Sequence, residues 1–347
     1  MLLNYRGLCN TTNGFILSSH ATLFIMQVGV LTVPVASEPL TDSLSYLDSI
    51  GVNAVELGCG GYPGDDHLSR EAYLDDEDAQ ADLHHLLDEC GMDVSALATH
   101  NNPLHPDEDR AAEADTELRE AITLADQLGV DAVTCFSGLP AGGPDDKVPN
   151  WVTAPWPSEH ADAHEYQWDV ATKYWTDLAE HAAFHGVDVA IEMHPNMLVY
   201  EPHGLLKLRE ATNDHIGANF DPSHLYWQGI DVTAAIRLLG DHDAIHHFHA
   251  KDTKLYEENA REKGVLDTTG YTEEADRSWL FRSIGYGHGE QHWKDVVSTL
   301  RMVGYDGALS IEHEDSLTSA REGLEKAVDV LDRAVFETQP GDAYWAE

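Results

Sequence analysis

The sequence predicts a single (β/α)8 barrel, the TIM-barrel fold. Three features predict it: eight short runs rich in Val, Ile, Leu and Ala, longer segments of helical periodicity between them, and a recurring helix–glycine–strand junction. Eight is the number of parallel strands that closes such a barrel. An open, doubly wound sheet is the alternative that this alternation leaves.

The predicted strands follow one another from Met26 onward. They are MQVGVLTV (26–33), NAVELG (53–58), MDVSALAT (92–99), VDAVTCF (130–136), VDVAIEM (187–193), IGANF (216–220), AIHHFHA (244–250) and GALSIEH (307–313). Amphipathic segments such as DEDAQADLHHLLDECG lie between them, and their final glycine is typical of a helix C-terminus. The junction recurs in SIGVNAVELG, ECGMDVSALA, QLGVDAVTCF, FHGVDVAIEM and MVGYDGALSI, which favours one barrel over two domains.

Two connections are long: residues 137–163, rich in Gly, Pro and Trp, and residues 251–289, which are highly charged. Connections of this length in a compact domain are usually functional. Both follow the C-terminal ends of strands, the face on which barrel enzymes carry their chemistry. The sequence therefore predicts a lid at each.

Charge limits the partners. The chain of 347 residues has 20 Lys and Arg against 62 Asp and Glu, a net charge of −42, with the acids spread along its length. Such a charge repels nucleic-acid phosphates and anionic membrane surfaces, so we expect neither as a partner. A surface that stays hydrated in concentrated salt explains the composition, and we expect the cytoplasm of a halophile.

The four cysteines, at positions 9, 59, 90 and 135, have no paired spacing, which suits a reducing compartment. The sequence has no run of about twenty apolar residues, so it predicts no membrane-spanning helix. Residues 1–25 are expected to be a disordered extension or a mis-set start, with a signal peptide as the less favoured alternative. Residues 26–335 form the predicted barrel domain, and residues 336–347 an acidic tail.

Four neighbouring predicted strands end in side chains that bind metals. Glu192 closes the fifth, Asp221 follows the sixth, His249 ends the seventh and Glu312 closes the eighth. Because parallel barrel strands end at one level, these side chains should converge on one divalent cation. Three carboxylates and one imidazole form an oxygen-rich site, which favours Mn²⁺, Mg²⁺ or Co²⁺ over Zn²⁺.

Further polar residues lie at the same strand ends. His249 is preferred over His247 as the ligand because it is nearer the C-terminal end of its strand, which leaves His247 in a lower layer or in contact with substrate. Asp252 is expected to orient an imidazole. The remaining residues predicted to bind substrate are His100, Glu56 and His194.

The motifs IEMHP, NFDPSH, FHAKD, GYGHGEQHW and GYDGALSIEHED together resemble the xylose isomerase-like barrel superfamily, which contains sugar isomerases, ketose 3-epimerases and inosose dehydratases. The resemblance runs from about Met26 to Arg333. It implies a Glu, Asp, His and Glu ligand set at the four positions above, and a further histidine at His224. Ketose 3-epimerases carry an arginine six residues after the ligand histidine, where this chain has Leu255. Substrate binding should therefore differ, with Arg282 as the candidate replacement cation.

The predicted chemistry is proton abstraction next to a carbonyl through a metal-stabilised enediolate. Glu192 and Glu312 would remove and return the proton, and His224 would act as an acid or hydrogen-bond donor. The sequence thus predicts a sugar or sugar-phosphate isomerase or epimerase. A keto-inositol or keto-sugar dehydratase and a non-catalytic sugar-binding barrel are the alternatives, while the net charge opposes an endonuclease. Whether the chain forms a homo-oligomer stays open.

Overall fold

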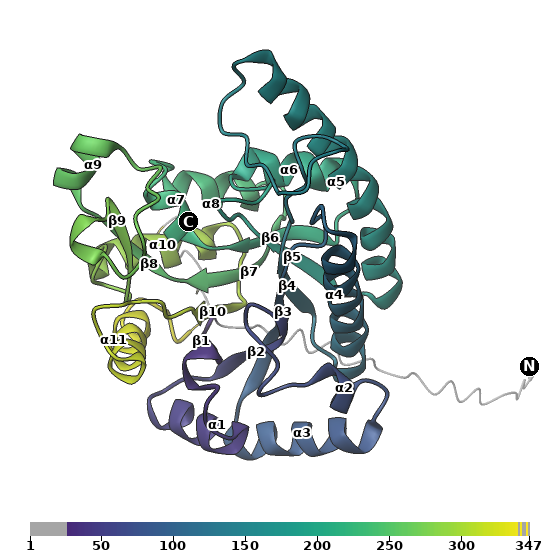
Figure 1. The fold of residues 1–347 in the computed structure, drawn as a ribbon. Helices are drawn as coiled ribbons and strands as arrows, with labels where there is room; N and C mark the ends of the chain where they lie inside the picture. The colour runs from purple at the N-terminus through teal and green to yellow at the C-terminus, as the bar shows by residue number, and fades with distance from the viewer. Residues whose placement is uncertain (1–25, 339–340, 342–344, 346–347) are drawn as a thin grey trace, which may run out of the picture.

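Eight parallel strands close into a barrel in the order β1-β10-β7-β6-β5-β4-β3-β2, with helices around the outside (Figure 1). The structure is a computed structural model that describes residues 26–338, 341 and 345. The barrel strands are β1 (Gln27–Leu31), β2 (Ala54–Gly61), β3 (Asp93–His100), β4 (Ala132–Phe136), β5 (Asp188–Glu192), β6 (Ile216–Phe220), β7 (Ile245–Ala250) and β10 (Ala308–Ile311). Each predicted strand overlaps one of these, so the predicted (β/α)8 barrel is confirmed and the doubly wound alternative is wrong.

The predicted extension over residues 1–25 lies outside the described residues, as does most of the predicted tail over residues 336–347. No helix in the described part of the chain combines the length and apolar composition needed to cross a membrane.

Helices follow the strands along the chain. They are α1 (Leu40–Ser49), α2 (Arg70–Tyr73), α3 (Glu77–Cys90), α4 (Glu108–Leu128), α5 (Ser158–His185), α6 (Pro202–Ala211), α7 (Pro222–Tyr226), α8 (Val232–Gly240), α9 (Glu257–Lys263), α10 (Glu290–Met302) and α11 (Ala320–Asp332), with 3-10 turns η1 (Val33–Val35) and η2 (Glu274–Asp276).

Helix α3 shows how local sequence sets these bounds. The Asp76 side chain accepts a hydrogen bond from the Ala79 N–H at the start of the helix, where backbone donors lack helical partners. Gly91 ends the helix with φ of +64°, a conformation that glycine adopts without steric cost. Leu83 and Leu87, one turn apart, are buried in the core that joins helices to strands.

The connection at residues 251–289 is folded. Strand β8 (Asp252–Leu255) pairs antiparallel with β9 (Trp279–Arg282), and α9 lies between them in the chain. Trp227, Trp279 and Phe281 form a small hydrophobic cluster at this hairpin. The connection after β4 is shorter than predicted, because α5 begins at Ser158.

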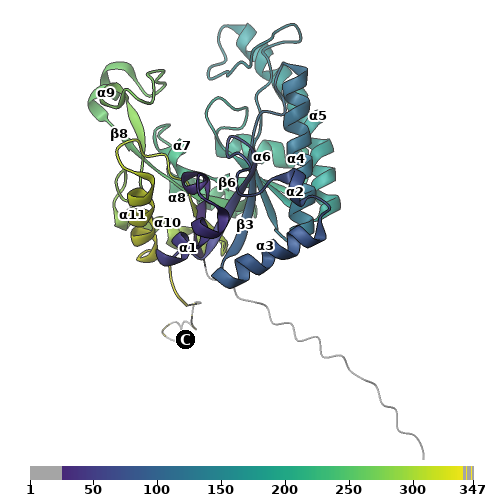
Figure 2. The ribbon, with the colours of Figure 1, turned by 60° about the horizontal axis from the view of Figure 1, so that its bottom comes forward.

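Both excursions project from the same end of the barrel (Figure 2). The hairpin with α9 stands on one side of that end, and the loop before α5 with the first turns of α5 stands on the other (Figures 1 and 2). The parallel strands also end there, so the fold places both insertions around the predicted site.

Candidate metal centre and active site

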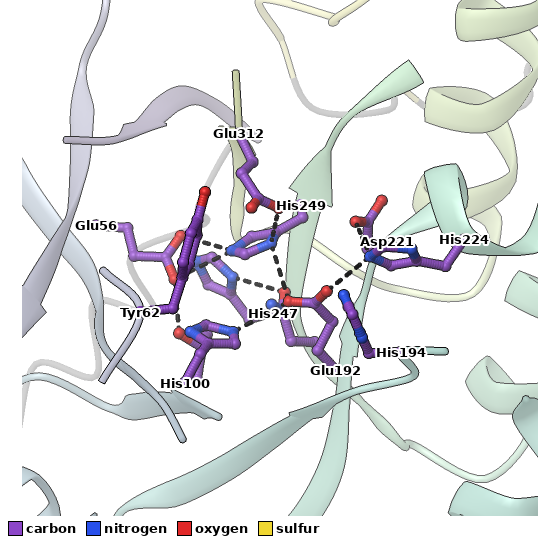
Figure 3. Close-up of polar contacts among 12 residues, drawn as sticks. Glu56, Tyr62, His100, Glu192, His194, Asp221, His224, His247, His249 and Glu312 are labelled. Carbon is purple, nitrogen blue, oxygen red and sulfur yellow. Dashed lines mark hydrogen bonds and ion pairs between the residues drawn. The ribbon is translucent and has the colours of Figure 1, made fainter. Parts of the chain in front are cut away.

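The four predicted metal ligands converge. Glu192 is the last residue of β5, His249 lies near the end of β7, and Asp221 and Glu312 directly follow β6 and β10. One ligand atom from each of the four side chains lies within 4.8 Å of the others, and the side chains point toward one another (Figure 3). The parallel pairing of β5 with β6 and of β7 with β10 brings these strand ends to one level.

The donor atoms of this cluster fit a cation. His249 Nδ1 lies 3.1 Å from Glu312 Oε2 and 3.5 Å from Glu192 Oε2. His249 Nδ1 and Glu312 Oε2 are buried, and apart from these close approaches and the ion pair of Glu312 with Lys251, neither makes a well-directed hydrogen bond. Buried polar atoms are rarely left without partners, because their desolvation is then uncompensated. A divalent cation held between these atoms would satisfy both.

The second ring nitrogen of His249 is held from below the cluster. His249 Nε2 lies 2.9 Å from Glu56 Oε2, and Glu56 also accepts hydrogen bonds of 2.6 Å from the hydroxyls of Thr134 and Ser310. Burial opposes ionisation of Glu56, but His249 and His247 hold its pKa below the usual range. The buried carboxylate thus takes the Nε2–H of His249 and leaves Nδ1 facing the cluster.

This position corrects the prediction that Glu56 binds a sugar hydroxyl. Strand β2 runs on to Gly61, three residues past its predicted end, so Glu56 lies inside the barrel rather than at its mouth. Its side chain is fully buried and takes no part in lining the active-site cavity.

His247 also lies inside the barrel. Its Nδ1 is 3.1 Å from Asn219 Oδ1, and its Nε2 is 3.2 Å from the Ser95 hydroxyl. It borders a cavity together with Tyr305, away from the metal cluster. Of the two alternatives, these contacts favour the lower-layer position of His247 over a substrate contact.

A cavity of about 410 Å³ opens onto the cluster. It combines an acidic floor with a largely apolar wall from β4 and the β8–β9 hairpin. Its lining residues are Leu31, Tyr62, His100, Phe136, Glu192, His194, Lys251, Tyr271, Leu280, Phe281, Glu312, Glu314 and Ser316. Two of the predicted metal ligands are therefore open to a ligand in the cavity.

Three histidines surround Glu192 at this cavity. His100 Nε2 lies 3.0 Å from Glu192 Oε2, and His224 Nε2 lies 3.0 Å from Glu192 Oε1 and 3.2 Å from Asp221 Oδ2 (Figure 3). Burial opposes ionisation of Glu192, but His100 and His224 hold its pKa well below the usual range. His194 lines the cavity with its ring centroid 4.2 Å from that of His224. Burial and His224 lower the pKa of His194 to about 3, so its imidazole is neutral near pH 7.

Lys251 is a site residue that the sequence reasoning missed. Its Nζ lies 3.1 Å from Glu312 Oε2, pairs with Glu314 and lies 4.2 Å from the Phe281 ring centroid. Burial opposes its charge, but Glu312 and Glu314 hold its pKa well above the usual range. The signal was present in FHAKD: residues two apart on a strand face the same way, so Lys251 shares the face of His249.

Two further predicted site residues, Asp252 and Arg282, lie in the β8–β9 hairpin. Asp252 accepts hydrogen bonds from the backbone N–H groups of Gly285, Gly287 and His288, and its other oxygen lies 2.8 Å from His288 Nδ1. It does orient an imidazole, but that of His288 rather than of a cluster residue. Arg282 donates its Nε–H to Asp315 over 3.0 Å and is not among the residues that line the cavity, so its contact with substrate stays a prediction.

Comparison with known proteins identifies the family to which the barrel belongs. A family model described as "Xylose isomerase-like TIM barrel" matches residues 44–334. The chain is 37% identical over 316 residues to the uncharacterized protein YfiH of Bacillus subtilis, a match that covers 90% of this chain and 100% of that protein. It is 29% identical over 160 residues to an inosose isomerase of Halalkalibacterium halodurans, covering 44% of this chain and 50% of that protein.

Two solved structures share the fold. The probable 3-DHS dehydratase AsbF of Bacillus anthracis matches with a TM-score of 0.63 and 16% identity over 88% of this chain and 99% of that chain. The IOLI protein with a binding zinc atom matches with a TM-score of 0.61 and 19% identity over 90% of this chain and 100% of that chain. At these identities the likeness speaks for the barrel and not for a reaction.

Proposed function

The chain belongs to the xylose isomerase-like TIM-barrel family, and from this premise we propose that it is a divalent-metal-dependent isomerase or epimerase of a small sugar. The observation that carries the proposal is the convergence of Glu192, Asp221, His249 and Glu312 beside a cavity of about 410 Å³. Cavities of a few hundred Å³ suit small molecules.

The reaction proposed is proton transfer at a carbon next to a carbonyl. A bound divalent cation would stabilise the negative charge that develops on the substrate oxygens. Glu192 and Glu312 both line the cavity, so one can accept the substrate proton as a carboxylate while the other, protonated from solvent, returns a proton as a carboxylic acid. Although burial opposes ionisation of Glu312, Lys251 and His249 lower its pKa to about 2, which keeps it ionised near neutral pH.

The histidines around Glu192 would orient it. His100 and His224 contact its two carboxylate oxygens, which fixes the carboxylate plane toward the cavity. Return of the proton to the same carbon gives epimerisation, and return to the neighbouring carbon gives isomerisation. The oxygen-rich ligand set supports Mn²⁺, Mg²⁺ or Co²⁺ ahead of Zn²⁺.

A keto-sugar dehydratase is the second candidate. Lys251 favours it, because an ammonium group at the cavity wall can donate a hydrogen bond to a departing hydroxyl, which would leave as water with the proton taken up by Glu192 or Glu312. The same abstraction by Glu192 or Glu312 would precede that step. A product that takes up deuterium without losing water would mark an isomerase or epimerase. A product lighter than the substrate by one water would mark the dehydratase.

The test is an incubation in D₂O. The protein, loaded separately with Mn²⁺, Mg²⁺, Co²⁺ or Zn²⁺, is given a panel of ketoses, sugar phosphates and keto-inositols, and the products are read by NMR and mass spectrometry. We expect metal-dependent deuterium uptake at a carbon next to the carbonyl. If the protein only binds sugars, no deuterium should enter the sugar. No deuterium uptake by any sugar with any of the four metals would refute the proposal.

We also infer a reducing, salt-rich cytoplasm as the working environment. The free thiols of Cys59, Cys90 and Cys135 support a reducing compartment, and the net charge of −42 supports high salt. Whether the chain forms a homo-oligomer stays open.

A further inference from the structure

We propose that Glu314 makes the active site selective for uncharged sugars, because it neutralises the one ammonium group that a phosphorylated or carboxylated substrate would need. This inference rests on the proposed function, since it takes the cavity above the metal cluster as a sugar site. Glu314 is outside the predicted ligand set, and neither of its carboxylate oxygens belongs to the converging cluster.

The charges that line the cavity are few. Among its described lining residues, the acids are Glu192, Glu312 and Glu314, the one lysine is Lys251, and there is no arginine. Glu192 and Glu312 belong to the metal cluster, where a divalent cation would balance them. Lys251 also lies 3.1 Å from Glu312 Oε2, but with Glu312 balanced by the cation, Lys251 and Glu314 are the remaining pair of opposite charges on the wall.

Glu314 is held in this position from two sides. One of its oxygens accepts a hydrogen bond of 2.5 Å from the Tyr62 hydroxyl, and the other pairs with Lys251. Tyr62 directly follows β2, so it reaches Glu314 from a different part of the barrel mouth. The Lys251 side chain is only 3% exposed and that of Glu314 28%, so the carboxylate lies on the solvent side of the ammonium group.

This geometry decides which substrates can use Lys251. An anion approaching the ammonium group from the cavity must come close to the Glu314 carboxylate, and the like charges repel strongly where water is scarce. A neutral sugar hydroxyl meets no such repulsion, because it can donate to Glu314. The apolar wall from Phe281 and Leu280 adds no cation that could compensate.

Glu314→Gln tests the inference directly. The amide keeps the size of the side chain and a hydrogen-bonding oxygen for Tyr62 but removes the charge. We expect the metal-loaded variant to bind sulfate, a dianion shaped like a phosphate ester, at least about tenfold more tightly than the wild type at constant ionic strength. Calorimetric titration measures this. Glu258→Gln, on the exposed first turn of α9, removes the same charge away from the cavity and should leave sulfate affinity unchanged.

A second variant identifies the group that binds the anion. Adding Lys251→Met to Glu314→Gln removes both charges, and the tenfold gain should disappear. Equal sulfate affinity in the wild type and Glu314→Gln would overturn the inference. A gain that survives Lys251→Met would also overturn it, because the anion would then be bound elsewhere.

Deuterium exchange separates this inference from the proposed function. D-fructose and D-fructose 6-phosphate are compared as a matched neutral and anionic pair. The wild type should exchange deuterium faster into the neutral sugar. In Glu314→Gln the ratio of the two exchange rates should fall by at least about tenfold. Faster deuterium exchange into the phosphate ester by the wild type would overturn the proposed selectivity for neutral sugars but would support the proposed enzymatic function. If no sugar exchanges, the proposed function fails, and the sulfate titration still decides the role of Glu314.

Discussion

At the scale of single residues, the orientation of His249 depends on a residue that touches no ligand atom of the cluster. Glu56 occupies the Nε2 side of the imidazole, and the hydroxyls of Thr134 and Ser310 hold Glu56 in turn. The chain therefore fixes which nitrogen faces the metal cluster through a buried carboxylate. Such carboxylate–histidine pairs raise the basicity of the ligand and limit the rotation of its ring.

Glu56→Gln should weaken metal binding by about 10- to 100-fold while the barrel stays folded, because the amide holds the imidazole less firmly. Equilibrium dialysis with Mn²⁺ measures the affinity, and circular dichroism checks the fold. Thr134→Val is the matched control, since it removes one hydrogen bond to Glu56 and leaves the carboxylate, so its effect should be several times smaller. Unchanged affinity in Glu56→Gln would show that the ring is oriented by other contacts.

Glu192→Gln should lower deuterium exchange by at least about a hundredfold, because a positioned proton acceptor contributes about 10²- to 10⁴-fold to such a step. The exchange rate is measured at saturating metal, so that a weaker ligand set does not account for the loss. Lys207→Gln changes a charged residue outside the catalytic cavity and should exchange normally. Turnover retained in Glu192→Gln would remove this residue from the mechanism.

The sequence was informative about residues where periodicity fixes direction. The strand ends located Glu192, Asp221, His249 and Glu312, because the end of a barrel strand specifies both level and face. The sequence did not show how far a side chain lies below the mouth of the barrel. The last three residues of β2 include two glycines and no β-branched residue, so the strand end could not be recognised and Glu56 was placed too near the mouth.

At the scale of elements, the β8–β9 hairpin and the turn after it are held together by one buried carboxylate. Asp252 accepts backbone N–H groups from Gly285, Gly287 and His288, which fastens residues 283–289 to the start of the hairpin. No sequence pattern predicted this pairing. Its two four-residue strands are joined by residues 256–278, whereas recognisable hairpins have short turns with Gly or Asn between the strands.

Asp252→Ala should lower the free energy of unfolding by about 3 kcal/mol, because several backbone donors lose their acceptor at once. Urea unfolding at pH 7 measures the change. His288→Ala removes one partner of Asp252 from a half-exposed position and should cost clearly less. Equal losses in the two variants would mean that the imidazole, and not the backbone donors, is what Asp252 holds.

At the scale of the whole molecule, the acids exceed what ion pairing can balance. With 62 Asp and Glu against 20 Lys and Arg, most carboxylates cannot pair one to one with a lysine or arginine. Pairs such as Arg321 with Glu38 are partly exposed, and exposed pairs of this kind contribute at most about 1 kcal/mol each. Repulsion among the unpaired carboxylates is therefore the larger effect, and it opposes the compact state at low ionic strength.

Salt should consequently stabilise this protein, although it weakens the individual ion pairs. We expect the free energy of unfolding to rise by at least about 1 kcal/mol between about 0.1 M and 1 M NaCl, since the screening length falls from about 10 Å to about 3 Å over that range. Thermal and urea unfolding at each concentration measure the rise. KCl at equal ionic strength should act like NaCl, whereas sucrose at equal water activity should give a smaller increase, because it does not screen charge. A flat or falling dependence on salt would mean that the ion pairs outweigh the repulsion, and the inference of a salt-rich cytoplasm would then lose its physical basis.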